Sequence, residues 1–426
     1  MPSKTGKNIG HQKVERNHPS TFHVIVLVFD LFSLETKVRK WIDSQFAGSK
    51  PNATSIYRII NLLFKLFVES GATLHKLDLY FSDYEINPEI FYSLGRNEQF
   101  FSLLQDLSLD LKPGFTTETV TTLLRIITKN ATKLSTLKLK GFYPYDEPDL
   151  FHALICIIKS QEQLRQFSLI GGDEFPMEFH GVVSALESQK KSLQEILIKF
   201  CYCNTEFEVL MNCKNLEILS IEYCNHENIL EASINTLKVN RWRIDASSIV
   251  QILLKSGTLL QRLSLVSEDD PIQEEPLLLE TLKSFCPNIT YLSIDGVRFS
   301  TQFQDLIGNL QKLQFLTLWD DDEILTDEQV MQFAKLLPLT LQYLDLNYSC
   351  LESYIDILLS NCYAPLKYLL VNRLCDEKKA KALAEFCIRN KSLNYVAVCV
   401  DLDDNIKKKV EEYVTLMPYD HAVVNC

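Results

Sequence analysis

Four thiols and one imidazole near the middle of the chain are of the types that bind zinc. They are Cys201, Cys203, Cys213, Cys224 and His226, and zinc prefers thiolate and imidazole ligands in structural sites. These cysteines form no C-x-x-C pair, however. Cys201 and Cys224 each fall three residues past a repeated strand pattern, at a place where a cysteine ordinarily turns inward to pack or to cap backbone. We therefore expect no metal site and no cofactor.

Motifs of common catalytic and nucleotide-binding sites are absent from the sequence. It contains no G-x-x-x-x-G-K-[ST], no G-x-G-x-x-G, no H-E-x-x-H and no G-x-S-x-G, which are the motifs of phosphate loops, dinucleotide sites, zinc proteases and serine hydrolases. The eight His residues form no evident pair with a nucleophile. We expect a protein that is not an enzyme and has no catalytic residue.

Six aromatic side chains in the C-terminal half are the better candidates for function. Aromatic side chains bury a large area with few rotatable bonds, so they are common anchors of protein interfaces. Five of the six occupy the third place of a repeated six-residue pattern, and the sixth occupies a seventh place. The predicted partner-binding residues are Tyr291, Phe315, Trp319, Tyr343, Tyr368 and Tyr395.

The pattern that positions these residues is L-x-x-L-x-L. It occurs thirteen times with Leu, Ile, Val or Phe at its first, fourth and sixth places, and its first places are residues 74, 104, 134, 164, 193, 216, 234, 260, 289, 313, 341, 366 and 393. Amphipathic segments such as residues 118–127 separate the copies. Strands that alternate with helices at a regular period predict a parallel sheet with right-handed crossovers. We expect an α/β leucine-rich-repeat solenoid, a horseshoe with the sheet on its concave face and helices on its convex face.

Alternation along each strand predicts where the candidate residues point. If the fourth and sixth places face the core, the third, fifth and seventh face the concave surface, and neighbouring strands about 4.8 Å apart align the third places into a row. Two interpretations of this row remain open. It can hold a partner protein, or its neighbouring rings can stabilise the sheet by about 0.2 to 1 kcal/mol per pair.

Charged residues line other parts of the expected concave surface. The N-terminal strands carry a mixture of Lys, Asp and Glu, such as Lys76, Asp78 and Lys140. Acidic loops follow two later strands at residues 268–270 and 320–323. The second loop directly follows Trp319, so it can receive a basic peptide or can simply be solvated.

Composition limits the class of partner and the compartment. The 426 residues have a formal net charge of -12, and a nucleic-acid partner requires concentrated positive charge. The apolar run at residues 22–29 is too short to span a bilayer. We expect a protein partner on the concave face, no nucleic acid and no membrane, reduced cysteines, and a cytoplasmic or nuclear location.

Four regions follow from these patterns. Residues 1–21 are a basic tail that we expect to be disordered. Residues 22–70 form a helical N-terminal cap, residues 71–400 the solenoid, and residues 401–426 a C-terminal cap helix and tail; solenoids require such polar end caps.

Several cysteines fall at repeat-related places, and these carry a family resemblance. Cys-Pro-Asn-Ile at 286–289, Cys-Lys-Asn-Leu at 213–216 and the places of Cys201 and Cys224 resemble the cysteine-containing, ribonuclease-inhibitor-like repeats of F-box/leucine-rich-repeat proteins. The resemblance extends from about Thr73 to Val400.

The resemblance implies a substrate receptor of an SCF-type ubiquitin ligase, or a descendant of one. In that family an F-box binds a Skp-type adaptor and cullin while the repeats capture the substrate. Here the F-box is absent or degenerate, since no Leu-Pro opens one and residues 22–46 are its only place for a remnant. Residues 22–70 are thus a helical cap or an F-box remnant. The alternative is a stand-alone scaffold or enzyme-regulating protein without a ubiquitin role.

Overall fold

The computed structural model describes most of the chain. The described residues are 26–45, 53–81, 97, 99–111, 117–142, 148–172, 178–179, 181–202, 205–224, 234–241, 243–267, 271–319, 324–372, 374, 377–398 and 404–424.

In the described parts of the chain, fifteen parallel strands form one sheet, in the order in which they occur in the sequence. Each strand pairs with the next one, as the alternation of strands and crossovers predicts. The strands are β1 (Val26–Asp30), β2 (Thr73–Phe81), β3 (Asp106–Leu111), β4 (Thr136–Phe142), β5 (Gln166–Gly171), β6 (Glu195–Lys199), β7 (Ile218–Glu222), β8 (Thr236–Arg241), β9 (Arg262–Ser267), β10 (Tyr291–Asp295), β11 (Phe315–Trp319), β12 (Tyr343–Asp345), β13 (Tyr368–Val371), β14 (Tyr395–Val398) and β15 (Thr415–Pro418).

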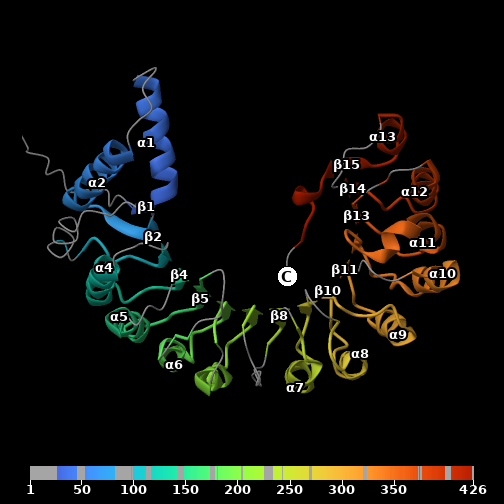
Figure 1. Ribbon diagram of the computed structural model, residues 1–426, viewed down its shortest axis with the longest axis horizontal. Helices are drawn as coiled ribbons and strands as arrows, with labels where there is room; N and C mark the ends of the chain where they lie inside the picture. The colour runs from blue at the N-terminus through green and yellow to red at the C-terminus, as the bar shows by residue number, and fades with distance from the viewer. Residues whose placement is uncertain are drawn as a thin grey trace, which may run out of the picture.

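Helices follow the strands on the outer side of the curved sheet, so the molecule is an open arc with strands along its inner side (Figure 1). The α-helices are α1 (Leu31–Gln45), α2 (Ala53–Glu69), α4 (Thr117–Asn130), α5 (Pro148–Lys159), α6 (Val182–Ala185), α7 (Ala246–Ser256), α8 (Glu275–Phe285), α9 (Thr301–Asn309), α10 (Asp327–Leu336), α11 (Ile355–Asn361), α12 (Glu377–Asn390) and α13 (Asp404–Glu411). Short 3₁₀ helices are η1 (Leu186–Gln189), η2 (Thr205–Asn212), η3 (Cys350–Tyr354) and η4 (Tyr419–His421).

The apolar places of the repeat form the core between sheet and helices. In β3, Leu107 and Leu109 are fully buried while Asp106, Ser108 and Asp110 are partly exposed on the other face. The fourth and sixth places of the other repeats are buried in the same cluster or packed against its edge. This confirms the α/β class and the parallel repeat architecture, because only stacked neighbours can bury each apolar face.

Local signals start the helices where the sequence predicts. The Thr326 hydroxyl accepts a hydrogen bond from the Gln329 backbone N–H at 3.3 Å, and the Gln329 side chain accepts one from the Thr326 N–H at 2.9 Å. This capping box opens α10 and satisfies two backbone donors that the helix itself cannot pair. The crossovers on either side of β6 have little α-helix in their described residues: between β5 and β6 lies α6, four residues long, which η1 continues, and between β6 and β7 lies the 3₁₀ helix η2.

Both ends of the sheet have a strand that the repeat pattern does not include. β1 lies within the expected helical cap and pairs with β2, with a register shift between Leu27 and Val28. At the other end α13 stops at Glu411, and Leu416, which we expected in a helix, lies in β15. There the Thr415 N–H donates to the Asn394 carbonyl at 2.9 Å, since an unpaired parallel edge favours another strand. Among the described residues, no helix combines the length and apolarity needed to cross a membrane.

Candidate functional site

Five of the predicted aromatic residues stand in one line across β10 to β14. Strand pairing places Tyr291 opposite Phe315, Phe315 opposite Tyr343, Tyr343 opposite Tyr368, and Tyr368 opposite Tyr395. The ring centroids of successive pairs lie 6.3, 5.5, 6.2 and 5.0 Å apart. The predicted alignment is therefore confirmed. We call these five residues the aromatic row.

Trp319 lies on the same face of the sheet, four residues beyond Phe315 in β11. Its ring stacks on Tyr348 with centroids 6.1 Å apart and an interplanar angle of 27°. Tyr348 is half exposed and has a backbone φ of 62°, a conformation that is uncommon for residues other than glycine. Trp319 and Tyr348 thus form a second aromatic pair near the carboxyl ends of β11 and β12.

Arg262 extends the aromatic row by one strand, although the sequence analysis did not select it. It pairs with Tyr291 across β9 and β10, and its guanidinium carbon lies 4.4 Å from the centre of the Tyr291 ring. A cation over an aromatic face is attracted by the ring's negative face. Its position in the sequence could have identified it, because Arg262 occupies the third place of its repeat, as the five residues of the aromatic row do.

The aromatic row is partly covered: Tyr291 and Tyr343 are buried, whereas Phe315, Tyr368 and Tyr395 are partly exposed. Tyr343 is 1% exposed and Tyr291 is 4% exposed. Both lie on the concave side, as predicted, but residues 419–424 return from β15 into the hollow of the arc, where the letter C marks the chain end (Figure 1). We call Tyr419–Val424 the return segment. No strand periodicity predicts this contact, since it joins residues up to 133 positions apart.

Side chains of the concave face bind the return segment by three hydrogen bonds. The Tyr291 hydroxyl donates to the Val424 carbonyl at 3.1 Å, and the Val424 N–H donates to the Tyr343 hydroxyl at 3.3 Å. The Tyr419 hydroxyl donates to Asp345 Oδ2 at 3.0 Å. Two of these bonds satisfy peptide groups, so the concave face recognises backbone as well as side chains.

A small apolar cluster, separate from the main core, packs the return segment against the sheet. Its buried members come from the sheet and from the return segment, and partly buried residues surround them. The buried residues are Tyr343, Leu370, Ala397 and Ala422, and the surrounding ones are Phe315, Tyr368, Met417, Tyr419, Val423 and Val424.

Burial perturbs the ionisable groups beneath the return segment. It raises the pKa of Asp345 from 3.8 to about 6, against the opposing effect of hydrogen bonds from the Asn347 N–H and the Tyr419 hydroxyl. Burial also raises the pKa of Tyr343 far above its ordinary value, and the nearby Asp345 charge adds to this. At neutral pH Tyr343 is therefore a neutral phenol, and the neighbouring Asp345 is ionised but takes up a proton at a higher pH than an exposed carboxylate does.

The N-terminal half of the concave face is polar, as predicted. Glu222 lies 2.8 Å from the Lys238 ammonium and 3.6 Å from that of Lys199. Burial opposes its ionisation, but the hydrogen bond and charge of Lys238 and the charge of Lys199 outweigh burial and lower its pKa. Lys199 also lies 5.1 Å from the ring centres of Phe200 and Tyr223, which stack on each other.

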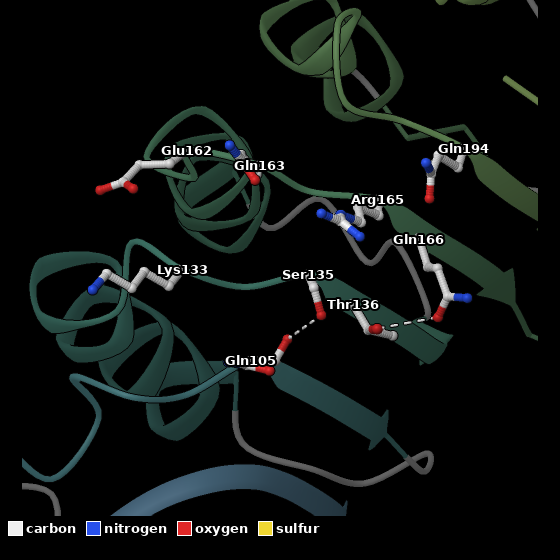
Figure 2. Close-up of a pocket in the computed structure, with 9 residues that line it drawn as sticks. All are labelled: Gln105, Lys133, Ser135, Thr136, Glu162, Gln163, Arg165, Gln166 and Gln194. Carbon is white, nitrogen blue, oxygen red and sulfur yellow. Dashed lines mark hydrogen bonds between the residues drawn. The ribbon is translucent and has the colours of Figure 1, made fainter. Parts of the chain in front are cut away.

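A polar pocket of about 640 Å³ opens at the amino ends of β3 to β6 (Figure 2). Each of these strands contributes the residue that directly precedes it. The Ser135 hydroxyl donates to the Gln105 carbonyl at 3.3 Å, and the Thr136 hydroxyl donates to the Gln166 amide oxygen at 3.1 Å. The lining residues are Gln105, Lys133, Ser135, Thr136, Glu162, Gln163, Arg165, Gln166 and Gln194. The pocket is thus lined by amides, hydroxyls and the charged side chains of Lys133, Glu162 and Arg165.

The two central cysteines have the structural role expected of them. Cys201 donates to the Lys199 carbonyl at 3.2 Å, and Cys224 donates to the Glu222 carbonyl at 3.3 Å. Both side chains are buried. Cys203 and His226, the other members of the zinc-like set, lie outside the described residues, as do the acidic loops at 268–270 and 320–323.

Comparison with protein-family models and with curated proteins finds no match for this chain. Its function must therefore be argued from the concave face itself.

Proposed function

We propose that this protein is a non-enzymatic recognition module that binds an extended segment of a partner protein across its aromatic row. The observation that carries this proposal is a pair of hydrogen bonds with the peptide groups of Val424: the Tyr291 hydroxyl donates to its carbonyl, and the Tyr343 hydroxyl accepts from its N–H. A surface that holds one peptide backbone in this way has the chemistry to hold another. The partner segment does not have to pair as an extra strand at the edge of the sheet, because side chains of the concave face supply the hydrogen bonds.

The repeat type that we propose is the leucine-rich-repeat horseshoe with ribonuclease-inhibitor-like units. Buried leucines at the first, fourth and sixth places support it, and so do the inward-turned thiols of Cys201 and Cys224. In such a solenoid the inner sheet is a long continuous surface, which suits recognition of a partner protein.

The finer proposal is a substrate receptor of an SCF-type ubiquitin ligase, or a descendant of one, in the cytoplasm or nucleus. A Skp-type adaptor and cullin would bind residues 22–70, where Trp41 and Leu66 are 55% and 58% exposed. Because β1 of this region pairs with β2, an adaptor bound there would be held in a fixed position relative to the aromatic row. The alternative is a stand-alone scaffold or enzyme regulator that binds partners without an adaptor.

Selection from a displayed library of random decapeptides tests the binding surface. We expect the full chain to enrich peptides with aromatic and branched apolar residues, and the variant Y368A/Y395A to bind them at least about tenfold more weakly. Both tyrosines are only partly buried, so the solenoid should survive the change. Peptides that bind the variant equally well would place recognition elsewhere.

Co-purification with a Skp-type adaptor and cullin separates the receptor from the scaffold. The full chain should retain the adaptor, and the exposed substitutions W41E and L66E should abolish retention, whereas the exposed change D43N, on the same helix as Trp41, should not. If the intact chain retains no adaptor, the stand-alone scaffold is the better description.

A further inference from the structure

The return segment occupies the surface proposed for a partner, and it is attached far more weakly than the strands beneath it. Between Tyr419 and Val424 only Ala422 is buried, while Asp420 and His421 are exposed. The chain leaves the sheet after Pro418, the last residue of β15 paired with β14. From there, hydrogen bonds with the side chains of Tyr291, Tyr343 and Asp345 and a small apolar cluster attach the segment to the concave face.

These contacts are weak enough to exchange with a competitor. Hydrogen bonds to water replace those of the segment when it leaves, and Ala422 is its one buried residue, so the segment's own contribution to the contact is small. A covalently linked segment competes at an effective concentration in the millimolar range. A partner of ordinary affinity can therefore displace it.

The surface beneath the return segment requires a cover. Tyr291, Tyr343 and Asp345 are 4%, 1% and 2% exposed, and their polar atoms are satisfied by the return segment and by the nearby Asn347 N–H. If the segment left without replacement, the rings of Phe315, Tyr343 and Tyr368 would face water. Release is therefore favoured when an incoming chain makes equivalent contacts.

We propose that Tyr419–Val424 is an intramolecular ligand of the aromatic row, and that the partner of this surface is an extended protein segment of the same chemistry which displaces it. This inference rests on the proposed function and specifies its partner. The partner presents a phenol to Asp345 and, three to five residues later, small and branched apolar side chains to Tyr343 and Tyr368. The pattern is Tyr-x-x-Ala-Val-Val. Its second and third residues can be of any type, because the corresponding Asp420 and His421 side chains are exposed.

A matched pair of full-length variants tests the proposal. A422D places a charge in the apolar cluster and should release the return segment, whereas H421D adds a negative charge at the exposed neighbouring residue. The probe is a fluorescein-labelled octapeptide with the sequence of residues 417–424, and fluorescence anisotropy measures its affinity. We expect A422D to bind the probe at least about tenfold more tightly than the unaltered chain and H421D do. A probe with Asp in place of its own Ala should not bind.

Amide hydrogen exchange supplies a readout that does not depend on any added peptide. Residues 419–424 should exchange much faster in A422D than in H421D, while β10 to β12 keep their protection and so report an intact solenoid. Y419F, which removes the hydroxyl that donates to Asp345, should show a smaller increase in exchange, and so provides a second variant. Equal protection of the return segment in A422D and H421D would overturn the proposal.

The outcomes also distinguish this inference from the proposed function. If library peptides bind in a manner sensitive to Y368A/Y395A but with equal affinity to A422D and H421D, the recognition surface stands and the displacement mechanism falls. If neither variant nor the unaltered chain binds the probe or any library peptide, both proposals fall. Tight probe binding by A422D that Y368A/Y395A abolishes supports both.

Discussion

The hydroxyl of Tyr419 donates a hydrogen bond of 3.0 Å to Oδ2 of Asp345, a residue 74 positions earlier in the chain. Asp345 lies at the end of β12, and its Oδ1 accepts from the Asn347 N–H at 3.0 Å. The bond therefore joins the return segment to a carboxylate of the sheet, beside the most deeply buried ring of the aromatic row.

Stability should depend on pH through Asp345. The pKa of Asp345 is raised by burial to about 6, so the folded state binds a proton more tightly than the unfolded state does. Protonated Asp345 therefore stabilises the folded state. This contribution is fully present below pH 3.8 and is lost as the pH rises through about 6, and the total loss in unfolding free energy is about 3 kcal/mol. Thermal unfolding of D345N between pH 4 and 7.5 should lack this component. The exposed D43N is the control, and identical profiles for D345N and the unaltered protein would contradict the assignment.

The aromatic row should also stabilise the sheet. Tyr368 and Tyr395 stack with ring centroids 5.0 Å apart at an interplanar angle of 17°. A double-mutant cycle of Y368A and Y395A, followed by urea unfolding, should give a coupling energy of about 0.5 to 1.5 kcal/mol. A coupling near zero together with loss of peptide binding would assign these rings to recognition alone.

Gln161 should be essential for stacking neighbouring repeats. Its buried amide accepts from the Leu134 N–H at 2.9 Å and donates to the Ala131 and Ile157 carbonyls at 3.0 and 2.9 Å. Q161L leaves the buried groups of the preceding repeat unpaired, so we expect a loss of about 2 to 4 kcal/mol in unfolding free energy. Q163L, at an exposed neighbouring position, should change it by less than about 0.5 kcal/mol. Similar values for the two variants would show that Gln161 is dispensable.

Two glycines with similar backbone φ angles should differ in how well they tolerate substitution by alanine. Gly71 and Gly141 have φ angles of 74° and 70°, and a β-carbon at Gly71 meets nothing within 4 Å. At Gly141 it would overlap the Leu111 carbonyl oxygen. We expect G71A to lower unfolding free energy by about 1 kcal/mol and G141A by about 3 kcal/mol or more. Equal losses would mean that β3 can shift away from the new methyl group.

The buried thiols should resist alkylation in the folded protein. Burial raises the pKa of Cys286 to about 12 and that of Cys362 to about 11, and both side chains are fully buried. Iodoacetamide reacts with the thiolate, so at pH 8 these residues should react at least about 100-fold more slowly than the partly exposed Cys156. Peptide mass spectrometry measures the rates, and the difference should vanish in guanidinium chloride. Comparable rates before unfolding would contradict the burial described.

The strand register was predictable because it is encoded locally. Each L-x-x-L-x-L copy specifies which side chains face the core, and stacking of identical units then aligns equivalent places. Tyr291 and Tyr395, 104 residues apart in the numbering, consequently belong to one row. The same rule places Arg262 opposite Tyr291 in line with the row, although its side chain is a cation and not an aromatic ring.

The ends of the solenoid were less predictable than its repeats. β1 and β15 lack the complete repeat pattern, and they form because an exposed parallel edge provides unpaired backbone groups. Such choices depend on neighbours that a local pattern does not identify.

The sequence by itself determined the alternation of parallel strands and helices and the line of aromatic residues, since both follow from side-chain periodicity and nearest-neighbour stacking. Only the tertiary structure decided that the return segment covers Tyr291 and Tyr343 of this row. Tyr419 meets Asp345, and Val424 meets Tyr291 and Tyr343, because the curvature of the whole sheet brings its hollow to the place where β15 ends. That curvature accumulates over many repeats, so no single segment of the sequence contains it.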